Sequence, residues 1–387
     1  MNSLHLPPLS LYVHIPWCVR KCPYCDFNSH TNNGNALPET NYVDALLADL
    51  ATEASSEKRQ GRQLISIFFG GGTPSLFSAA AIARILEGAE RLIGFAPAVE
   101  ITLEANPGTV EQQKFTGFRK AGVNRLSIGI QSFNDTHLKR LGRIHNGTEA
   151  LTAIHTARQA GFDNINLDLM HGLPEQTPEQ AIADLQQAMD FQPEHLSWYQ
   201  LTIEPNTAFH NQPPVLPIES TLERIQGQGH KLLAKAGFFA YEISAYARPQ
   251  RLSQHNCNYW QFGDYLGIGA GAHGKITDLN EQKILRTRKT RQPSDYLSRL
   301  ATGSDFLAEQ FSLDSKELPL EFLMNALRLK QGVPTTLFTE RTGMSLTTIT
   351  AHWQSLEARH LVEPLSTGWL RCTAFGHRFL NSILSEF

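Results

Sequence analysis

Three cysteines near the beginning of the sequence have the type and spacing of metal ligands: Cys18, Cys22 and Cys25, in a C-x3-C-x2-C pattern. Soft thiolate ligands at this spacing favour zinc or an iron–sulfur cluster. A structural zinc site is normally closed by a fourth cysteine or histidine, whereas a 4Fe–4S cluster with three protein ligands keeps one iron open. Three residues could supply a fourth zinc ligand: His14, His30 and Cys257.

A second group of residues offers polar contacts to a small ligand. Phe68–Ser75 contains three consecutive glycines, which let a ligand approach the backbone closely. Later positions supply a carboxylate, a carboxamide, a guanidinium and a second carboxylate, namely Glu104, Gln131, Arg143 and Asp168. Because a guanidinium binds a carboxylate in bidentate fashion and carboxylates accept from hydroxyl or amino groups, this set suits a zwitterionic, ribose-bearing ligand.

The hydrophobic pattern predicts the scaffold that brings these residues together. Apolar, β-branched or aromatic runs predict six buried strands: Leu11–Ile15, Ser66–Phe69, Glu100–Glu104, Arg125–Ile130, Asn164–Met170 and Leu196–Ile203. Helical spacing predicts helices between and after them: Tyr42–Glu53, Ala80–Leu92, Val110–Ala121, Thr148–Ala160, Pro178–Phe191 and Glu219–Ala236. This alternation predicts an α/β fold, a partial (β/α)6 barrel like part of a TIM barrel. Its chemistry is expected where the strands end.

The remainder of the chain predicts two further regions. We expect the barrel over residues 1–240 and a connecting region over 241–304, in which Asp278–Ser304 is polar and irregular. From 305 to 387 the pattern predicts a mainly helical domain that resembles a winged helix, with a short hairpin around Trp369. Ser315–Phe387 carries 7 Lys/Arg against 6 Asp/Glu, which argues against binding of nucleic acid.

Composition sets the class of protein. The 387 residues are 41% hydrophobic with a formal net charge of -3, which predicts a globular chain without long-range attraction for nucleic acid. No apolar stretch approaches the roughly 18 residues that span a bilayer, and the N-terminal segment lacks the pattern of a signal peptide. We therefore expect a cytoplasmic protein whose five cysteines form no disulfide framework. A homodimer, and peripheral membrane contact through a partner, remain open.

The segment Tyr12–Phe27, YVHIPWCVRKCPYCDF, resembles the signature of the radical S-adenosylmethionine (SAM) superfamily. The resemblance implies that Cys18, Cys22 and Cys25 hold a 4Fe–4S cluster, whose open iron binds SAM and whose electron cleaves it to a deoxyadenosyl radical. It also implies a set of SAM-contacting residues: Tyr12, Gly71, Gly72, Thr73, Glu104, Gln131, Arg143, Asp168 and Thr202. Thr202 stands where the pattern of the related oxygen-independent coproporphyrinogen III dehydrogenases has alanine.

Within this superfamily the whole chain resembles two related groups, the oxygen-independent coproporphyrinogen III dehydrogenases and the HemW haem chaperones. Three features favour the haem chaperones. Phe27 replaces a dehydrogenase cysteine two positions after the third ligand, only eleven residues precede Tyr12, and His255–Trp260 (HNCNYW) matches the HNxxYW motif of the chaperones.

The resemblance implies a protein that binds haem and transfers it to apo-haemoproteins, on a scaffold that also holds a 4Fe–4S cluster and SAM. His255 could supply an axial imidazole, while Tyr259 and Trp260 offer flat faces to the macrocycle. Cys257 is an alternative thiolate ligand. Two other functions stay open: oxidative decarboxylation of coproporphyrinogen III, and a radical modification of RNA that the charge balance opposes. Whether the protein is an enzyme also stays open.

Overall fold

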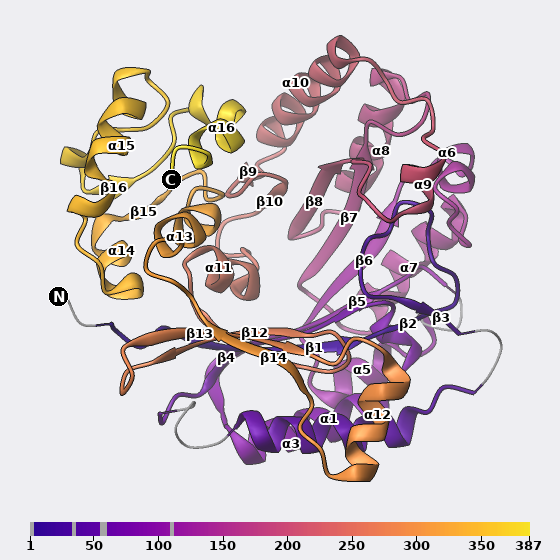
Figure 1. Cartoon of the computed structure of the whole chain (residues 1–387). Coiled ribbons are helices and arrows are strands. Elements are labelled where there is room, and N and C mark those ends of the chain that lie inside the picture. Colours follow the sequence, from indigo (N-terminus) through magenta and orange to yellow (C-terminus); the bar gives the residue numbers. More distant parts are fainter. Residues whose placement is uncertain (1–3, 33–35, 55–59, 109–111) are drawn as a thin grey trace.

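The computed structural model describes residues 4–32, 36–54, 60–108 and 112–387, and these are built around one large sheet (Figure 1). Its twelve strands run in the order β14-β13-β12-β11-β1-β4-β5-β6-β7-β8-β10-β9, so the two edges do not meet and the barrel is partial. Seven neighbouring strands run parallel. Six are the barrel strands β1 (Leu9–Ile15), β4 (Leu64–Gly71), β5 (Phe95–Ala105), β6 (Arg125–Gln131), β7 (Ile165–His171) and β8 (His195–Gln200), and the seventh, β11 (Asp264–Ile268), pairs with β1.

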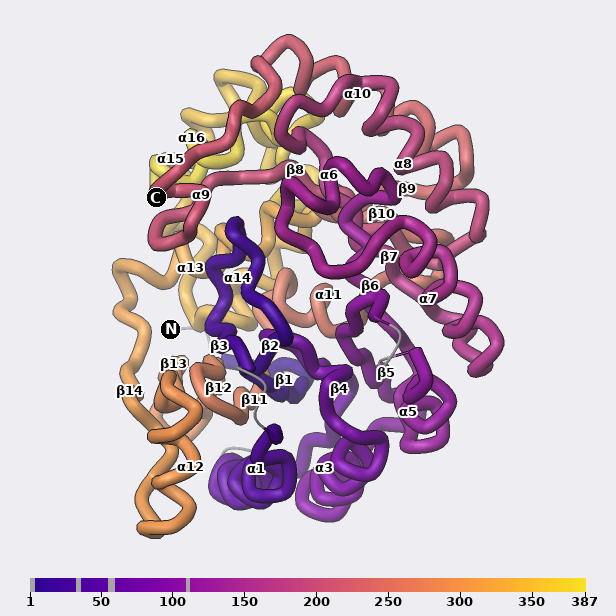
Figure 2. Tube along the Cα trace, turned by 90° about the vertical axis from the view of Figure 1, so that its right-hand side faces the viewer, coloured from indigo at the N-terminus to yellow at the C-terminus, as the bar shows by residue number. Residues whose placement is uncertain are grey.

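Helices cover the outer face of these strands, and Figure 2 shows the larger ones in an arc around them. They are α1 (Glu39–Glu53), α3 (Ala79–Leu92), α5 (Phe115–Ala121), α6 (Asp135–Arg140), α7 (Gly147–Gln159), α8 (Pro178–Asp190) and α10 (Glu219–Lys235). The short helix α9 (Ala208–Asn211) lies instead against the cysteine loop, where the Phe209 N–H donates to the Pro23 carbonyl. The predicted α/β fold and partial (β/α)6 barrel are thereby confirmed. Residues 110–111 of one predicted helix lie outside the described residues.

Local sequence signals account for several helix ends. Asn146 and Glu149 form a capping box at the start of α7, and Thr177 with Gln180 forms another at the start of α8. Gly122 ends α5 with a φ of 112°, a left-handed conformation that glycine adopts without strain. The last parallel strand is shorter than predicted, because its ladder with β7 ends at the pair His171–Gln200.

The predicted irregular linker Asp278–Ser304 is wrong. That stretch includes a sheet strand and a helix, because the main sheet continues past β1 through β11 (Asp264–Ile268), β12 (His273–Asp278), β13 (Lys283–Lys289) and β14 (Leu307–Ser312), with α12 (Pro293–Thr302) before the last strand. Its polarity has a physical cause. Lys289 of β13 is buried and donates to the carboxylates of Asp49 and Glu53 on α1, at 2.5 and 2.7 Å. The predicted domain boundaries remain predictions.

Shorter elements complete the barrel side. The far edge of the sheet holds β10 (Ala245–Ala247) and β9 (Phe239–Ala240), and the small strands β2 (Trp17–Cys18) and β3 (His30–Thr31) pair with each other. The helix α11 (Gln254–Trp260) contacts β1, β4 and β11.

The C-terminal part is mainly helical, as predicted. It contains α13 (Leu318–Ala326), β15 (Val333–Pro334), α14 (Thr335–Thr342), α15 (Thr347–Ala358), β16 (Trp369–Leu370) and α16 (Leu380–Leu384), with short 3-10 turns at Leu365–Thr367 and Gly376–Phe379. Strands β15 and β16 pair antiparallel, and a bridge joins Val362 to Cys372, which gives the winged-helix-like hairpin. No helix in the described ranges is long and apolar enough to cross a membrane.

Candidate metal and cofactor site

The three predicted cluster ligands line one cavity of about 400 Å³, here named the cluster cavity. Cys18 ends β2 and is 9% exposed, while Cys22 and Cys25 are half-buried on the loop that leads to β3. All three are free thiols. Each has a polar neighbour: Thr73 Oγ1 donates to Cys18 Sγ at 3.6 Å, Arg143 Nη1 donates to Cys22 Sγ at 3.5 Å, and Cys25 Sγ lies 3.7 Å from Ser29 Oγ.

The arrangement of these thiols fits a cluster better than a single zinc ion. Among the described residues, no group of three or more His, Cys, Asp or Glu side chains is close enough to hold one metal ion. The three candidates for a fourth zinc ligand do not line the cluster cavity. The ring nitrogens of His14 are bonded to Tyr12 and to the Asn28 carbonyl. The three thiols line the same cavity but are too far apart to bind one metal ion together, which suits a cluster whose separate irons each take one thiolate.

The glycine loop Gly71–Thr73 is built against the cysteine loop. A Cβ at Gly72 would lie 2.5 Å from the carbonyl oxygen of Trp17, so only glycine fits there. The Gly72 N–H donates to the Ile15 carbonyl and the Thr73 N–H to the Trp17 carbonyl, both at 2.8 Å. These two N–H groups therefore hold the cysteine loop in place. The carbonyl oxygens of the glycine loop stay available to accept from the amino group of a ligand.

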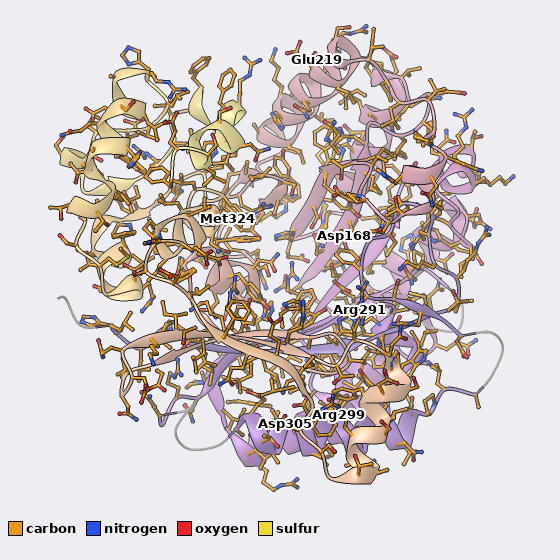
Figure 3. The ribbon with its side chains drawn as sticks, in the orientation of Figure 1. Asp168, Glu219, Arg291, Arg299, Asp305 and Met324 are labelled. Carbon is orange, nitrogen blue, oxygen red and sulfur yellow. The ribbon has the colours of Figure 1, made fainter. Side chains whose placement is uncertain are left out.

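Two carboxylates form the polar wall of the cavity. Glu104 ends β5 and accepts from the Gly71 N–H at 3.2 Å. Asp168 of β7 accepts from Ser127 Oγ at 2.8 Å and Asn166 Nδ2 at 2.9 Å, and Figure 3 labels it in the middle of the molecule. Burial and the charge of Asp168 raise the pKa of Glu104 to about 8, and burial also raises the pKa of Asp168. Glu104 can therefore hold a proton at neutral pH and release it when a cation binds.

Arg143 joins this wall to the cysteine loop. Its Nη2 donates to Asn106 Oδ1 at 2.6 Å and to the Gly129 carbonyl at 3.0 Å, while Nη1 reaches the thiol of Cys22. Within the described part of the chain, the buried Nε has no hydrogen-bond partner. The guanidinium thus keeps one unused N–H, and Arg143 lines a cavity where an anionic group is expected.

Sequence reasoning missed two residues of this cavity. Asn106 accepts from Arg143 and donates to Thr73 Oγ1 at 2.9 Å, so it connects two predicted site residues. Tyr199 of β8 donates its hydroxyl to Gln131 Oε1 at 2.7 Å, and Gln131 has a φ of 66° at the end of β6. Their position at strand ends is the signal that could have found them.

Two of the predicted SAM-contacting residues lie apart from the cluster cavity. Tyr12 of β1 lines a neighbouring cavity of about 600 Å³, here named the Tyr259 cavity, and bonds to His14 Nδ1 at 3.0 Å. Thr202 is exposed, two residues past the end of β8, and does not line the cluster cavity. Ten of the predicted residues line the cluster cavity: Cys18, Cys22, Cys25, Gly71, Gly72, Thr73, Glu104, Gln131, Arg143 and Asp168.

His255 lies on α11 and packs against the strands of the barrel. Its side chain is 3% exposed, and Nδ1 lies 3.1 Å from Ser66 Oγ. The ring stacks on Phe68 with centroids 5.0 Å apart and lies 4.9 Å from the ring of Tyr259. Burial lowers its pKa to about 3, so the imidazole is neutral. A ligand could reach this ring only after α11 or its aromatic neighbours move.

Two family models match this chain, one in the barrel and one in the C-terminal domain. A family model described as the radical SAM superfamily matches residues 12–188, and one described as the HemN C-terminal domain matches residues 313–376. A solved structure titled coproporphyrinogen III oxidase (HemN) from Escherichia coli superposes with a TM-score of 0.81. That likeness covers 98% of this chain and 90% of the other, at 23% identity, so it concerns the fold alone.

Two curated relatives match at higher identity. Heme chaperone HemW of Escherichia coli K12 is 49% identical over 382 residues, which cover 99% of this chain and 98% of the relative. Heme chaperone HemW of Haemophilus influenzae is also 49% identical, with the same coverage of both chains. The chain therefore belongs to the HemW haem chaperone family, within the radical SAM superfamily.

Proposed function

We propose that this protein is a haem chaperone, which binds haem and transfers it to apo-haemoproteins. The observation that carries the proposal is its 49% identity, over almost the full length of both chains, to relatives named heme chaperone. Phe27 agrees with it, because a phenylalanine stands where the coproporphyrinogen dehydrogenases have a cysteine. We also infer that the scaffold holds a 4Fe–4S cluster and SAM, as its superfamily implies.

In this proposal the cluster cavity binds the cluster and SAM. Cys18, Cys22 and Cys25 hold the cluster, which supplies the electron for SAM cleavage when it is bound. The carbonyls of the glycine loop accept from the SAM amino group, and Arg143 binds its carboxylate through unused N–H capacity. Glu104 and Asp168 provide negative charge near the sulfonium and acceptors for the ribose. Tyr12 and Thr202 do not line this cavity, so no SAM contact is assigned to them in this arrangement.

The Tyr259 cavity supports the haem part of the proposal. It shares Phe27 with the cluster cavity and has flat rings from Tyr12, Tyr259 and Tyr265 in its wall. Arg288 and Arg291 also line it, and guanidinium groups suit the propionates of haem. His255 lies behind Tyr12 and Tyr259, and its neutral imidazole could coordinate iron after these rings move. We therefore propose His255 as an axial ligand, with Cys257 as the alternative.

A haem titration of the cluster-reconstituted protein tests this proposal. We expect wild type to shift the Soret band of haem, and His255→Ala to weaken binding by about tenfold or more. His155→Ala is the matched control, because His155 is an exposed histidine on α7. Under anaerobic reducing conditions with SAM, we expect no conversion of coproporphyrinogen III. Absence of haem binding, or robust conversion, would contradict the proposal.

A further inference from the structure

A third cavity, of about 550 Å³, lies where the barrel meets the C-terminal domain and is not used by the proposed function. We name it the His171 cavity. Its walls come from the ends of β7 and β8, from α10, and from the segment around Gly376–Phe379. The residues used below are His171, Trp198, His230, Lys330, His377 and Arg378.

His171 is the feature of this cavity that packing alone does not explain. It ends β7, is 4% exposed, and its ring lies 4.3 Å from that of Trp198. No hydrogen-bond partner for its Nδ1, or for the buried Nε1 of Trp198, is found among the described residues. Buried polar atoms are nearly always paired in folded proteins. Two unpaired donors or acceptors at one cavity point to a ligand that is bound there in use.

The histidines of the cavity are suited to bind a metal rather than an anion. Burial lowers the pKa of His171 to about 4, with a smaller contribution from His230. Burial, together with Lys330, lowers the pKa of His377 to about 4. Neutral imidazole is the form that coordinates metals. The ring of His230 lies between Trp198 and Tyr246, with centroids 6.1 and 6.0 Å away.

A bare metal ion does not fit this cavity. The histidines do not approach closely enough to form a three-ligand group anywhere in the described ranges. Iron within a porphyrin needs only one or two protein ligands, because the macrocycle supplies the others. The ring of Trp198 offers an aromatic wall to such a plane. Lys330 and Arg378 add two cations, and the contact of Arg378 with Glu223, at 3.5 Å between exposed groups, is readily exchanged.

We propose that the His171 cavity is a second haem-coordinating site, with His171 as axial ligand and with Lys330 and Arg378 binding the haem carboxylates. This inference rests on the proposed function. It adds a second haem site, which lies between the barrel and the C-terminal domain. Tyr199 lines both this cavity and the cluster cavity, and its hydroxyl donates to Gln131. Haem in this site would therefore share the wall residue Tyr199 with the cluster cavity.

Haem titration of the full, cluster-reconstituted chain tests the second site. His171→Ala is compared with wild type, and the same change is made in the His255→Ala background. We expect His171→Ala to shift the Soret band and to weaken a component of haem binding by about tenfold in both backgrounds. Free imidazole should restore the Soret band of His171→Ala. The exposed His155→Ala should change neither quantity.

Arg378→Glu provides an independent variant, because its side chain is 68% exposed and the change is not expected to impair folding. We expect it to weaken the same component by about threefold or more. Unchanged haem binding in both His171→Ala and Arg378→Glu would overturn the second site. Unchanged binding in Arg378→Glu alone would also overturn it if His171→Ala fails to fold. Failure of wild type to bind any haem would instead refute the proposed function.

Discussion

Glu104 is a buried carboxyl group that lines the cluster cavity close to a second carboxyl group, that of Asp168. Its pKa is raised to about 8 by burial and by the neighbouring Asp168, so most of the carboxyl groups are protonated at neutral pH in the ligand-free protein. A raised pKa means that the folded chain binds this proton more tightly than the unfolded chain does. Stability from this group is therefore present at acid pH and is lost as the pH rises from the ordinary value of 4.5 to about 8.

The first prediction concerns the pH dependence of SAM binding. Because SAM carries a positive sulfonium, it should bind more strongly to ionised Glu104. We expect SAM affinity to rise with pH up to about 8, by at most about tenfold per pH unit, and then to level off. Calorimetric titration across this range measures it. Glu104→Gln should remove most of the slope and raise the melting temperature near pH 8, and a wild-type slope equal to that of the variant would contradict the assignment.

The second prediction concerns the cluster ligands. Cys18→Ala removes a thiol that lines the cluster cavity, so the reconstituted variant should lose the brown chromophore and most of its roughly four irons per chain. Iron analysis and visible absorption measure the loss. Cys372→Ala is the matched control, since Cys372 is also buried but lies in the C-terminal domain. Full iron content in Cys18→Ala would refute the ligand assignment.

Among the elements, β13 is the strand whose role was misread from sequence. Its register with β12 and β14 places Lys289 at the end of the strand, where the ammonium reaches Asp49 and Glu53 of α1. All three side chains are at most 2% exposed. The contact joins a late strand to the first large helix, so the strands after β11 belong to the same packed unit as the barrel.

The third prediction tests this integration. Lys289→Ala removes the buried cation that pairs with Asp49 and Glu53, which should lower the free energy of unfolding by about 3–5 kcal/mol. Its neighbour Arg288 pairs with Glu309 at the surface, where the side chains are 54% and 46% exposed. Arg288→Ala should therefore cost no more than about 1 kcal/mol. Denaturant unfolding compares them, and equal losses would mean that the buried pairs do not join the strand to the barrel.

Hydrophobic pattern predicted the parts of the fold that bury continuous apolar surface. Strands such as Arg125–Gln131 and the capping boxes of α7 and α8 follow from local sequence. The strands around Lys289 were not predicted, because the charged residues of a buried ion pair look in the sequence like those of an exposed polar linker. The HNCNYW segment was matched as a motif, but its burial depends on contacts such as Asn258 with Ser10 at 2.9 Å, which join positions 248 residues apart.

The candidate site also has a part that the sequence predicts and a part that it does not. Cys18, Cys22 and Cys25 are close in sequence, so their shared cavity follows from spacing and the loop that carries them. Asn106 and Tyr199 contribute through hydrogen bonds that span 33 to 68 positions, and a single sequence holds no record of such pairing. Glu104, Gln131 and Arg143 were assigned from the family resemblance. Hydrophobic periodicity alone does not distinguish these polar residues from ones that are exposed at the surface.

At the scale of the whole molecule, the cluster cavity lies between two others that are lined by aromatic rings and cations. Phe27 is shared with the Tyr259 cavity, and Tyr199 with the His171 cavity. The C-terminal domain contributes to the His171 cavity through Lys330 and His377. This arrangement places both proposed haem sites next to the proposed SAM site, so occupancy of one should affect the others.

Haem transfer tests the central claim most directly. Cluster-reconstituted protein is loaded with haem, freed of excess haem, and mixed with an apo-haemoprotein such as apomyoglobin, while both Soret bands are followed. The account predicts that wild type binds haem and passes it to the acceptor, that His155→Ala does the same, and that His255→Ala takes up less haem and therefore transfers less. Failure of wild type to bind haem, or to pass bound haem to the acceptor, would contradict the assignment as a haem chaperone.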